Sequence, residues 1–130
     1  MTENKNAKVY LMAMGIFYLA FGLITIFYPK MMQLFQTASG VAANTPFSDT
    51  IWVHEGLDIL SVTILLFVLS RQAASAAILR ATAVVALMPA IGIVYSCFAT
   101  PFWSMLFLGP CVFCVAFSVW GFALAGKAAK

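Results

Sequence analysis

Charged residues are scarce in this chain. Only 8% of its 130 residues are Asp, Glu, Lys or Arg, whereas an ordinary soluble domain carries about 25%. Hydrophobic residues make up 64% of the chain, and its mean hydropathy is +1.02. This composition excludes an ordinary water-soluble domain and predicts a protein whose main partner is the lipid bilayer.

Histidine and cysteine are also rare, with one and three residues respectively. Because the number of cysteines is odd, a complete disulfide framework is excluded. One histidine without a second ligand cluster leaves a metal shell incomplete, so no metal site is predicted. The seven basic residues are scattered at the ends of apolar runs, which argues against a nucleic-acid partner.

Four long apolar runs fill most of the chain. A membrane-spanning helix needs about 20 predominantly apolar residues, and runs of this kind lie at about 8–28, 51–70, 79–99 and 102–125. The predicted fold class is all-α: a polytopic membrane four-helix bundle with up-down topology, forming a single transmembrane domain over residues 1–130. The connector 29–50 is predicted to contain a short segment that lies on the membrane interface.

Basic residues mark one side of the predicted bundle. Under the positive-inside rule this side is cytoplasmic, so both termini are predicted there, in a multi-pass protein of the plasma (inner) membrane. The opposite side carries Lys30, and Trp52 and Trp103 are expected at its membrane interface. The basic residues on the predicted cytoplasmic side are Lys5, Lys8, Arg71, Arg80, Lys127 and Lys130.

The second apolar run contains three ionisable residues, His54, Glu55 and Asp58. An uncompensated carboxylate in the bilayer costs roughly 2.5–3.5 kcal/mol on insertion scales, so such groups usually face a bundle interior, a partner or a water-filled cavity. On a helix, positions 54, 58 and 61 share one face, which joins His54, Asp58 and Ser61 into a polar stripe with Glu55 at its edge. A polar site inside the membrane is therefore predicted.

Tyr28 and Tyr95 are expected at the level of this stripe and complete the predicted ligand- or proton-binding set. Three interpretations of the set stay open. In the first, its members hydrogen-bond one another and only stabilise the bundle. In the second, His54 and Tyr95 hold the polar head of a quinone-like or other amphipathic molecule, whose proton Asp58 handles. In the third, the carboxylates form a site for proton- or cation-coupled transport.

Cys111 and Cys114 have the C-x-x-C spacing of dithiol redox motifs. They lie in an apolar run without a basic neighbour that would favour the thiolate, and cysteine is also a common small packing residue. Packing and redox chemistry both remain open for this pair.

The chain resembles the DoxX-like group of small four-helix membrane proteins. The resemblance is carried by Tyr18–Gly22 and Tyr28-Pro29 in the first run, by Glu55-Gly56-Leu57-Asp58 in the second, and by Arg80 at the start of the third. Members of that group are associated with membrane oxidoreductase systems, including small subunits of quinone-linked sulfur oxidation. The resemblance therefore implies a redox-associated membrane subunit.

The predicted function is that of an accessory or quinone-handling subunit of a membrane redox system, with a polar pocket in the outer leaflet. A quinone is the candidate cofactor, and another membrane or redox subunit is the candidate partner. The alternatives are a small proton- or cation-coupled carrier and a structural subunit of a membrane complex. The sequence identifies no catalytic residues, and whether the chain is an enzyme stays open.

Overall fold

The computed structural model describes residues 2–128, which are predominantly helical and contain no β-strand. The four long helices are α1 (Thr2–Phe27), α3 (Pro46–Leu69), α4 (Ala76–Ala99) and α5 (Leu108–Ala128). Short helices η1 (Pro29–Phe35) and α2 (Ala38–Ala42) lie between α1 and α3, and η2 (Met105–Phe107) precedes α5. All four long helices are long and apolar enough to cross a membrane. The prediction of an all-α, multi-pass membrane protein is confirmed at this level.

Local capping residues explain where the spanning helices begin. The α3 helix starts at Pro46 instead of residue 51, because the backbone N–H of Thr45 donates to Ser48 Oγ (3.1 Å) and proline suits the first helical turn. The α4 helix starts at Ala76 instead of residue 79, because Ser75 Oγ accepts the N–H of Ile78 (3.3 Å). The polar groups of α3 therefore lie farther from its N-terminus than the sequence predicts.

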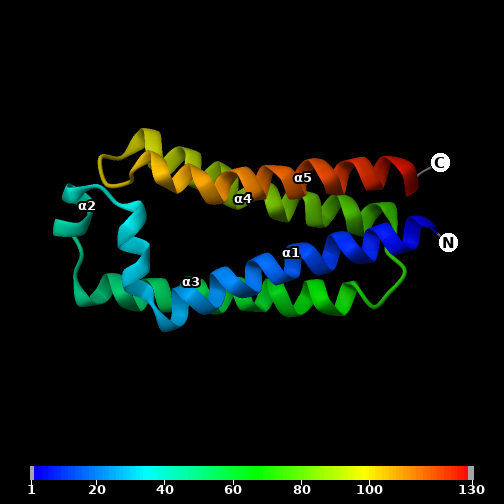
Figure 1. The fold of residues 1–130 in the computed structure, drawn as a ribbon, viewed down its shortest axis with the longest axis horizontal. Coiled ribbons are helices and arrows are strands. Elements are labelled where there is room, and N and C mark those ends of the chain that lie inside the picture. Colours follow the sequence, from blue (N-terminus) through cyan, green and yellow to red (C-terminus); the bar gives the residue numbers. More distant parts are fainter. Residues whose placement is uncertain (1, 129–130) are drawn as a thin grey trace.

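The long helices form two hairpins (Figure 1). In the first hairpin α1 packs along α3, and in the second α4 packs along α5. Close contact in the first hairpin depends on glycine: a Cβ atom at Gly56 would lie 2.6 Å from Ile26 Cγ1 and 3.0 Å from the carbonyl oxygen of Gly22. Small residues at such crossings let two backbones approach closely in the membrane.

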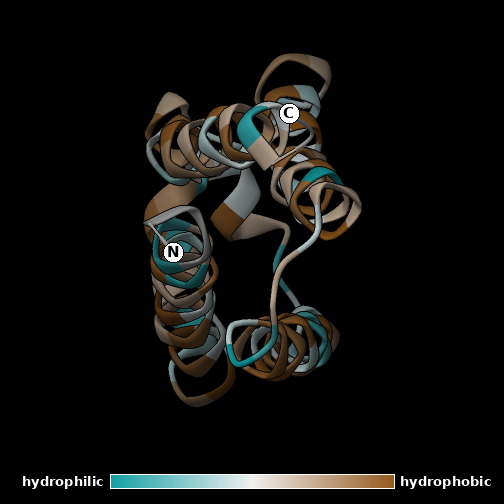
Figure 2. Ribbon diagram, turned by 90° about the vertical axis from the view of Figure 1, so that its right-hand side faces the viewer, coloured by the Kyte–Doolittle hydropathy of each residue, from teal (hydrophilic) through white to brown (hydrophobic). Residues whose placement is uncertain are grey.

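The two hairpins meet mainly through α1 and α5. Near the termini, the rings of Tyr10 and Trp120 contact edge to face with their centroids 5.4 Å apart. Farther along, the ring of Phe17 stacks on Phe113 (5.4 Å) and contacts Phe117 (5.6 Å). Hydrophobic residues surround the long helices on all sides (Figure 2), as expected for helices that face lipid as well as one another.

Both described ends of the chain lie at the same end of the bundle, which we call the terminal end (Figure 1). The opposite end, the connector end, is formed by η1, α2 and the turn before η2. Here Thr37 N donates to Phe102 O (2.9 Å) and Ser104 N to Phe35 O (2.8 Å), which fastens the connector of one hairpin to the turn of the other. Met32 of η1, which lies in the connector predicted to contain an interfacial segment, is only 2% exposed and packs inside the bundle.

Candidate functional site

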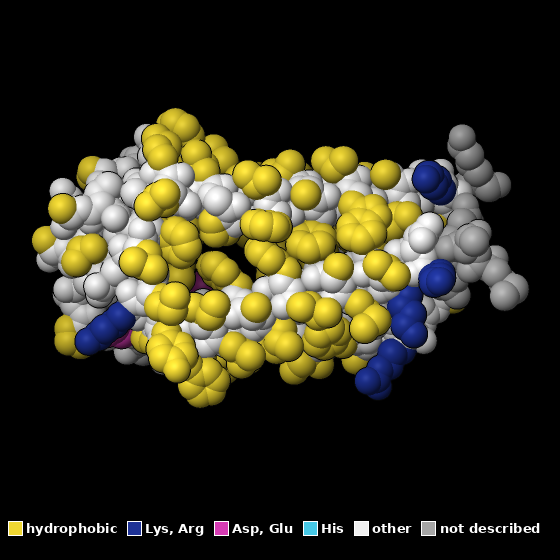
Figure 3. Space-filling view, viewed as in Figure 1, with side chains coloured by type: hydrophobic (Ala, Val, Ile, Leu, Met, Phe, Trp, Pro, Cys, Tyr) yellow, Lys and Arg dark blue, Asp and Glu magenta, His cyan; other side chains and the backbone are white. Residues whose placement is uncertain are grey.

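A cavity of about 400 Å³ lies between the two hairpins, in the half of the bundle nearer the connector end. This volume is within the range of about 300–1,000 Å³ that is usual for small-molecule sites. Figure 3 shows a hollow between α1 and the α4–α5 hairpin, with an acidic side chain visible inside it. Most of the cavity wall is aromatic or aliphatic, and its residues include Phe17, Phe21, Trp52, Ile93, Trp103 and Phe107.

Two tryptophans form the wall of the cavity at the connector end. Trp52 of α3 and Trp103 contact edge to face with their ring centroids 5.5 Å apart, and Trp103 stacks on Phe107 at 4.5 Å. The structure packs both tryptophans between the hairpins, and their expected position at the membrane interface stays a prediction.

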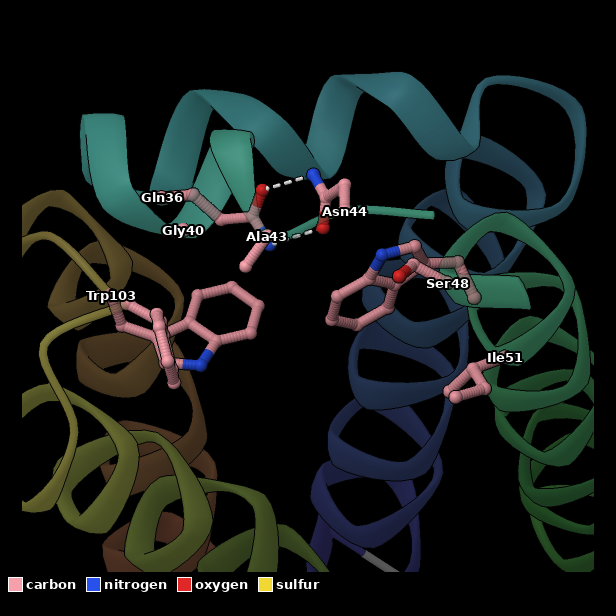
Figure 4. Close-up of a pocket in the computed structure, with 9 residues that line it drawn as sticks. Gln36, Gly40, Ala43, Asn44, Ser48, Ile51 and Trp103 are labelled. Atoms are coloured by element: carbon pink, nitrogen blue, oxygen red, sulfur yellow. Dashed lines mark hydrogen bonds between the residues drawn. The ribbon is translucent and has the colours of Figure 1, made fainter. Parts of the chain in front are cut away.

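A smaller pocket of about 210 Å³, here called the vestibule, lies on the connector side of these tryptophans (Figure 4). The side-chain amides of Gln36 and Asn44 pair across it: Asn44 Nδ2 donates to Gln36 Oε1 (2.7 Å) and Gln36 Nε2 to Asn44 Oδ1 (3.3 Å). Trp52 and Trp103 line both the vestibule and the central cavity. The tryptophan pair therefore separates the two spaces.

The central cavity contains few polar side chains, and each comes from a different spanning helix. Glu55 belongs to α3, Tyr18 to α1, Ser96 to α4 and Cys114 to α5. Tyr18 is 6% exposed, and its hydroxyl oxygen is buried without a hydrogen-bond partner among residues 2–128. Leaving such a group unpaired costs about 1–3 kcal/mol. An aromatic cavity with one carboxylate and an unpaired hydroxyl group suits an apolar molecule with a small polar head.

A second space of about 380 Å³, here called the α3–α4 groove, lies between those two helices. Glu55 and Asp58 of α3 both line it, opposite Val85, Met88 and Pro89 of α4. The two carboxylates are three positions apart and so share one side of the helix.

The structure brings together two of the six predicted binding residues, Glu55 and Asp58, at the α3–α4 groove. All four of these α3 residues, His54, Glu55, Asp58 and Ser61, are exposed, but His54 and Ser61 line neither the groove nor the central cavity. Ser61 Oγ donates instead to Leu57 O of its own helix (3.0 Å). His54 precedes Gly56 by two residues, about 200° around the helix, and Gly56 faces α1. His54 therefore points away from α1, on the outer surface of the bundle.

Tyr28 and Tyr95 are exposed as well, at 65% and 68%. Tyr28 borders a shallow hollow at the end of α1, together with Leu23, Ile24 and Phe27. Neither tyrosine lines the central cavity or the α3–α4 groove. Tyr95 is the immediate neighbour of Ser96, which does line the cavity, so the helix turns the tyrosine outward at that point.

All three cysteines are buried and free. The Sγ atom of Cys111 contacts the carbonyl oxygen of Ala90 (3.7 Å), and that of Cys97 contacts Ser104 O (3.5 Å), so both thiols bond to backbone within the second hairpin. Cys114 differs because it lines the central cavity. Residues 2–128 contain no group of three His, Cys, Asp or Glu side chains that could hold a metal ion.

Of the two polar cavity residues that were not predicted as binding candidates, Tyr18 and Ser96, the buried one is Tyr18. It lies within the Tyr18–Gly22 segment of the first apolar run, where nothing distinguishes it from the other tyrosines in the chain. Spacing alone could not have identified it, because it meets Glu55 only when α1 packs along α3.

Comparison with known proteins gives no further identification. The chain matches no protein-family model, no curated protein and no solved structure.

Proposed function

We propose that this membrane protein binds a quinone-like amphipathic molecule in its central cavity, as an accessory or quinone-handling subunit of a membrane redox system. The observation that carries the proposal is the aromatic cavity in which the Glu55 carboxylate and the unpaired Tyr18 hydroxyl group are the main hydrogen-bonding groups. Sites for small molecules combine mostly apolar walls with a few polar groups that fix orientation.

Each part of the cavity matches one part of such a ligand. A planar ring fits beside the aromatic side chains of Trp103 and Phe107, since aromatic pairs gain about 0.5–1.5 kcal/mol beyond area burial. The Tyr18 hydroxyl group can donate to a ring carbonyl oxygen, and the Glu55 carboxylate can accept from a ring hydroxyl group. A partner subunit would exchange electrons with the bound ring. The proposed membership of the DoxX-like group agrees with this role and rests on the sequence resemblance.

The proposed orientation places the cavity in the outer leaflet of the plasma membrane. Lys5, Lys8, Arg71, Arg80 and Lys127 lie at the terminal end of the bundle, where Figure 3 shows basic side chains gathered. The positive-inside rule assigns that end to the cytoplasm. The connector end and the cavity near it would then lie toward the outside.

A fluorescence titration tests the proposal, because Trp52 and Trp103 line the cavity and a quinone ring bound beside them quenches their emission. We expect saturable quenching when a decyl-tailed benzoquinone is added to the protein in nanodiscs. Glu55→Gln should weaken the affinity for the corresponding quinol, measured by its competition with the quinone, about tenfold, since the carboxylate accepts from the quinol hydroxyl group and a hydrogen bond to a charged group contributes about 1.5–3 kcal/mol.

Asp49→Asn is the matched control, because Asp49 is an acidic residue in the first turn of the same helix and lines neither the cavity nor the groove. It should leave the affinity unchanged. Quenching that rises linearly with quinone, without saturation, would contradict the proposed binding site, as would equal weakening by both substitutions.

A small proton- or cation-coupled carrier is the second candidate, favoured by the pairing of Glu55 with Asp58 along the α3–α4 groove. Carboxylates at membrane depth commonly serve as proton relays. Proton entry into liposomes that contain the protein, reported by an enclosed pH dye and lost in Asp58→Asn, would favour the carrier over the quinone-handling subunit.

A further inference from the structure

The helices α3 and α4 follow one another in the chain but do not pack along each other. Instead α3 packs on α1 and α4 packs on α5, and residues 70–75 bridge the two hairpins at the terminal end. The α3–α4 groove fills the space left between them. Among residues 2–128, no side-chain hydrogen bond and no contact between aromatic rings joins α3 to α4.

The α3–α4 groove adjoins the central cavity. Tyr18, Glu55, Ile59 and Pro89 line both spaces, so the groove leads from the outer surface of α3 and α4 to the polar groups inside. Met88, on the groove wall, is 59% exposed within a membrane-spanning helix. The mouth of the groove therefore faces the lipid of the bilayer.

Aromatic contacts border two other sides of the cavity. Toward the vestibule, the edge-to-face pair of Trp52 and Trp103 lies across the path. On the α1–α5 side, Figure 3 shows the hollow in which an acidic side chain is visible, and the ring of Phe17, which stacks on Phe113 and contacts Phe117, lies on that side. The α3–α4 groove differs from both because two carboxylates, those of Asp58 and Glu55, line it.

We infer that the ligand of the central cavity is a membrane-dissolved amphiphile that enters sideways between α3 and α4. Its polar head passes Asp58 and reaches Glu55, while its apolar tail stays in the α3–α4 groove against Val85 and Met88 and continues into the lipid. Along this path the head always meets a hydrogen-bonding group, so the cost of moving it through hydrocarbon is reduced. The inference rests on the proposed function, because it concerns access to the same cavity.

Narrowing the groove tests this path. Val85 and Val84 are neighbours in α4 with similar exposure, 40% and 45%, but only Val85 lines the groove. We expect Val85→Phe to slow both the onset of tryptophan quenching by a decyl-tailed benzoquinone and its reversal by about tenfold, with little change in the final amplitude, because a narrowed entrance changes rates more than affinity. Val84→Phe should leave both rates unchanged.

Val62→Phe narrows the same groove from α3 and serves as the second variant if Val85→Phe does not fold. Unchanged rates in the groove variants, with the wild-type amplitude retained, would overturn sideways entry between α3 and α4 and leave ligand binding intact. Absence of saturable quenching in the wild-type protein would overturn both the binding proposal and the entry path. Slowing by Val84→Phe equal to that by Val85→Phe would also overturn the path.

Discussion

The Tyr18 hydroxyl group makes no geometrically defined hydrogen bond within the described part of the chain, and this gives the cavity its clearest single-residue test. Removing a hydroxyl group that makes no hydrogen bond within residues 2–128 should not weaken the fold. If a ligand uses the hydroxyl group, Tyr18→Phe should reduce the affinity by about 1 kcal/mol, or roughly fivefold. Titration of tryptophan fluorescence with the decyl-tailed benzoquinone measures this effect.

Tyr10→Phe is the matched control for this substitution. Tyr10 lies on the same helix, is fully buried, and likewise has a hydroxyl group that makes no geometrically defined hydrogen bond to any residue the structure describes. It lines neither the central cavity nor the groove, so its loss should not change the affinity. A Tyr18→Phe protein that binds as tightly as wild type would show that the hydroxyl group does not contact the ligand.

At the residue scale, the sequence predicted the two carboxylates that line the cavity and the groove but not the Tyr18 hydroxyl group beside them. Glu55 and Asp58 were predictable because acidic side chains are rare and costly within apolar helices. The grouping of His54 and Ser61 with Asp58 followed the helical period, yet the cavity lies on another side of α3. The pattern of polar residues along a single helix does not show which side of the polar stripe contacts a neighbouring helix.

At the scale of helices, the crossing of α1 and α3 depends on Gly56. A methyl group there would press on Ile26 and on the Gly22 carbonyl oxygen at 3.0 Å, and that backbone atom cannot rotate away. We expect Gly56→Ala to destabilise the protein by about 1–3 kcal/mol, the usual cost of overpacking. Equilibrium unfolding in mixed detergent and dodecyl sulfate measures the change.

Gly126→Ala provides the comparison, because a Cβ atom at that position of α5 would have no neighbour within 4 Å. Its free energy of unfolding should stay close to that of wild type. If Gly56→Ala were as stable as Gly126→Ala, the close approach of α1 and α3 would be wrong.

The helix boundaries show which features of the helices could be predicted from the sequence. Apolar runs located all four spanning helices, because their hydropathy depends only on composition. The start of α5 at Leu108 instead of residue 102 could not be read in this way, because Phe102, Met105, Leu106 and Phe107 extend the apolar run of α5 toward the N-terminus. Residues 100–107 contain a turn in which Trp103 forms an isolated antiparallel β-bridge with Gln36 of the connector. The two residues lie far apart in the sequence.

At the scale of the whole molecule, the pairing of helices into hairpins creates the cavity, and composition does not specify this pairing. Hydrophobic residues cover all sides of the long helices (Figure 2), so no apolar stripe marks the packed face, as it would in a soluble bundle. In lipid, close packing of small residues decides which helices meet. The position of the cavity between the hairpins could therefore not be predicted from the sequence, although a polar site within the membrane was predicted.

Membrane orientation determines which leaflet the cavity faces, and the charge distribution predicts it. The basic side chains at the terminal end should hold that end in the cytoplasm, with the connector end outside. Ser39, in α2, and Ala73, between α3 and α4, are both exposed and lie at opposite ends of the bundle. Each can be replaced by cysteine in a background where all three native thiols are buried.

In intact bacterial cells whose outer membrane admits the reagent, a maleimide that cannot cross the inner membrane should label Ser39→Cys. It should label Ala73→Cys only after the inner membrane has been permeabilised, because the positive-inside rule places the loop between α3 and α4 in the cytoplasm. The wild-type protein, with its buried thiols, measures the background. The reverse labelling pattern would contradict the proposed orientation and place the cavity in the inner leaflet.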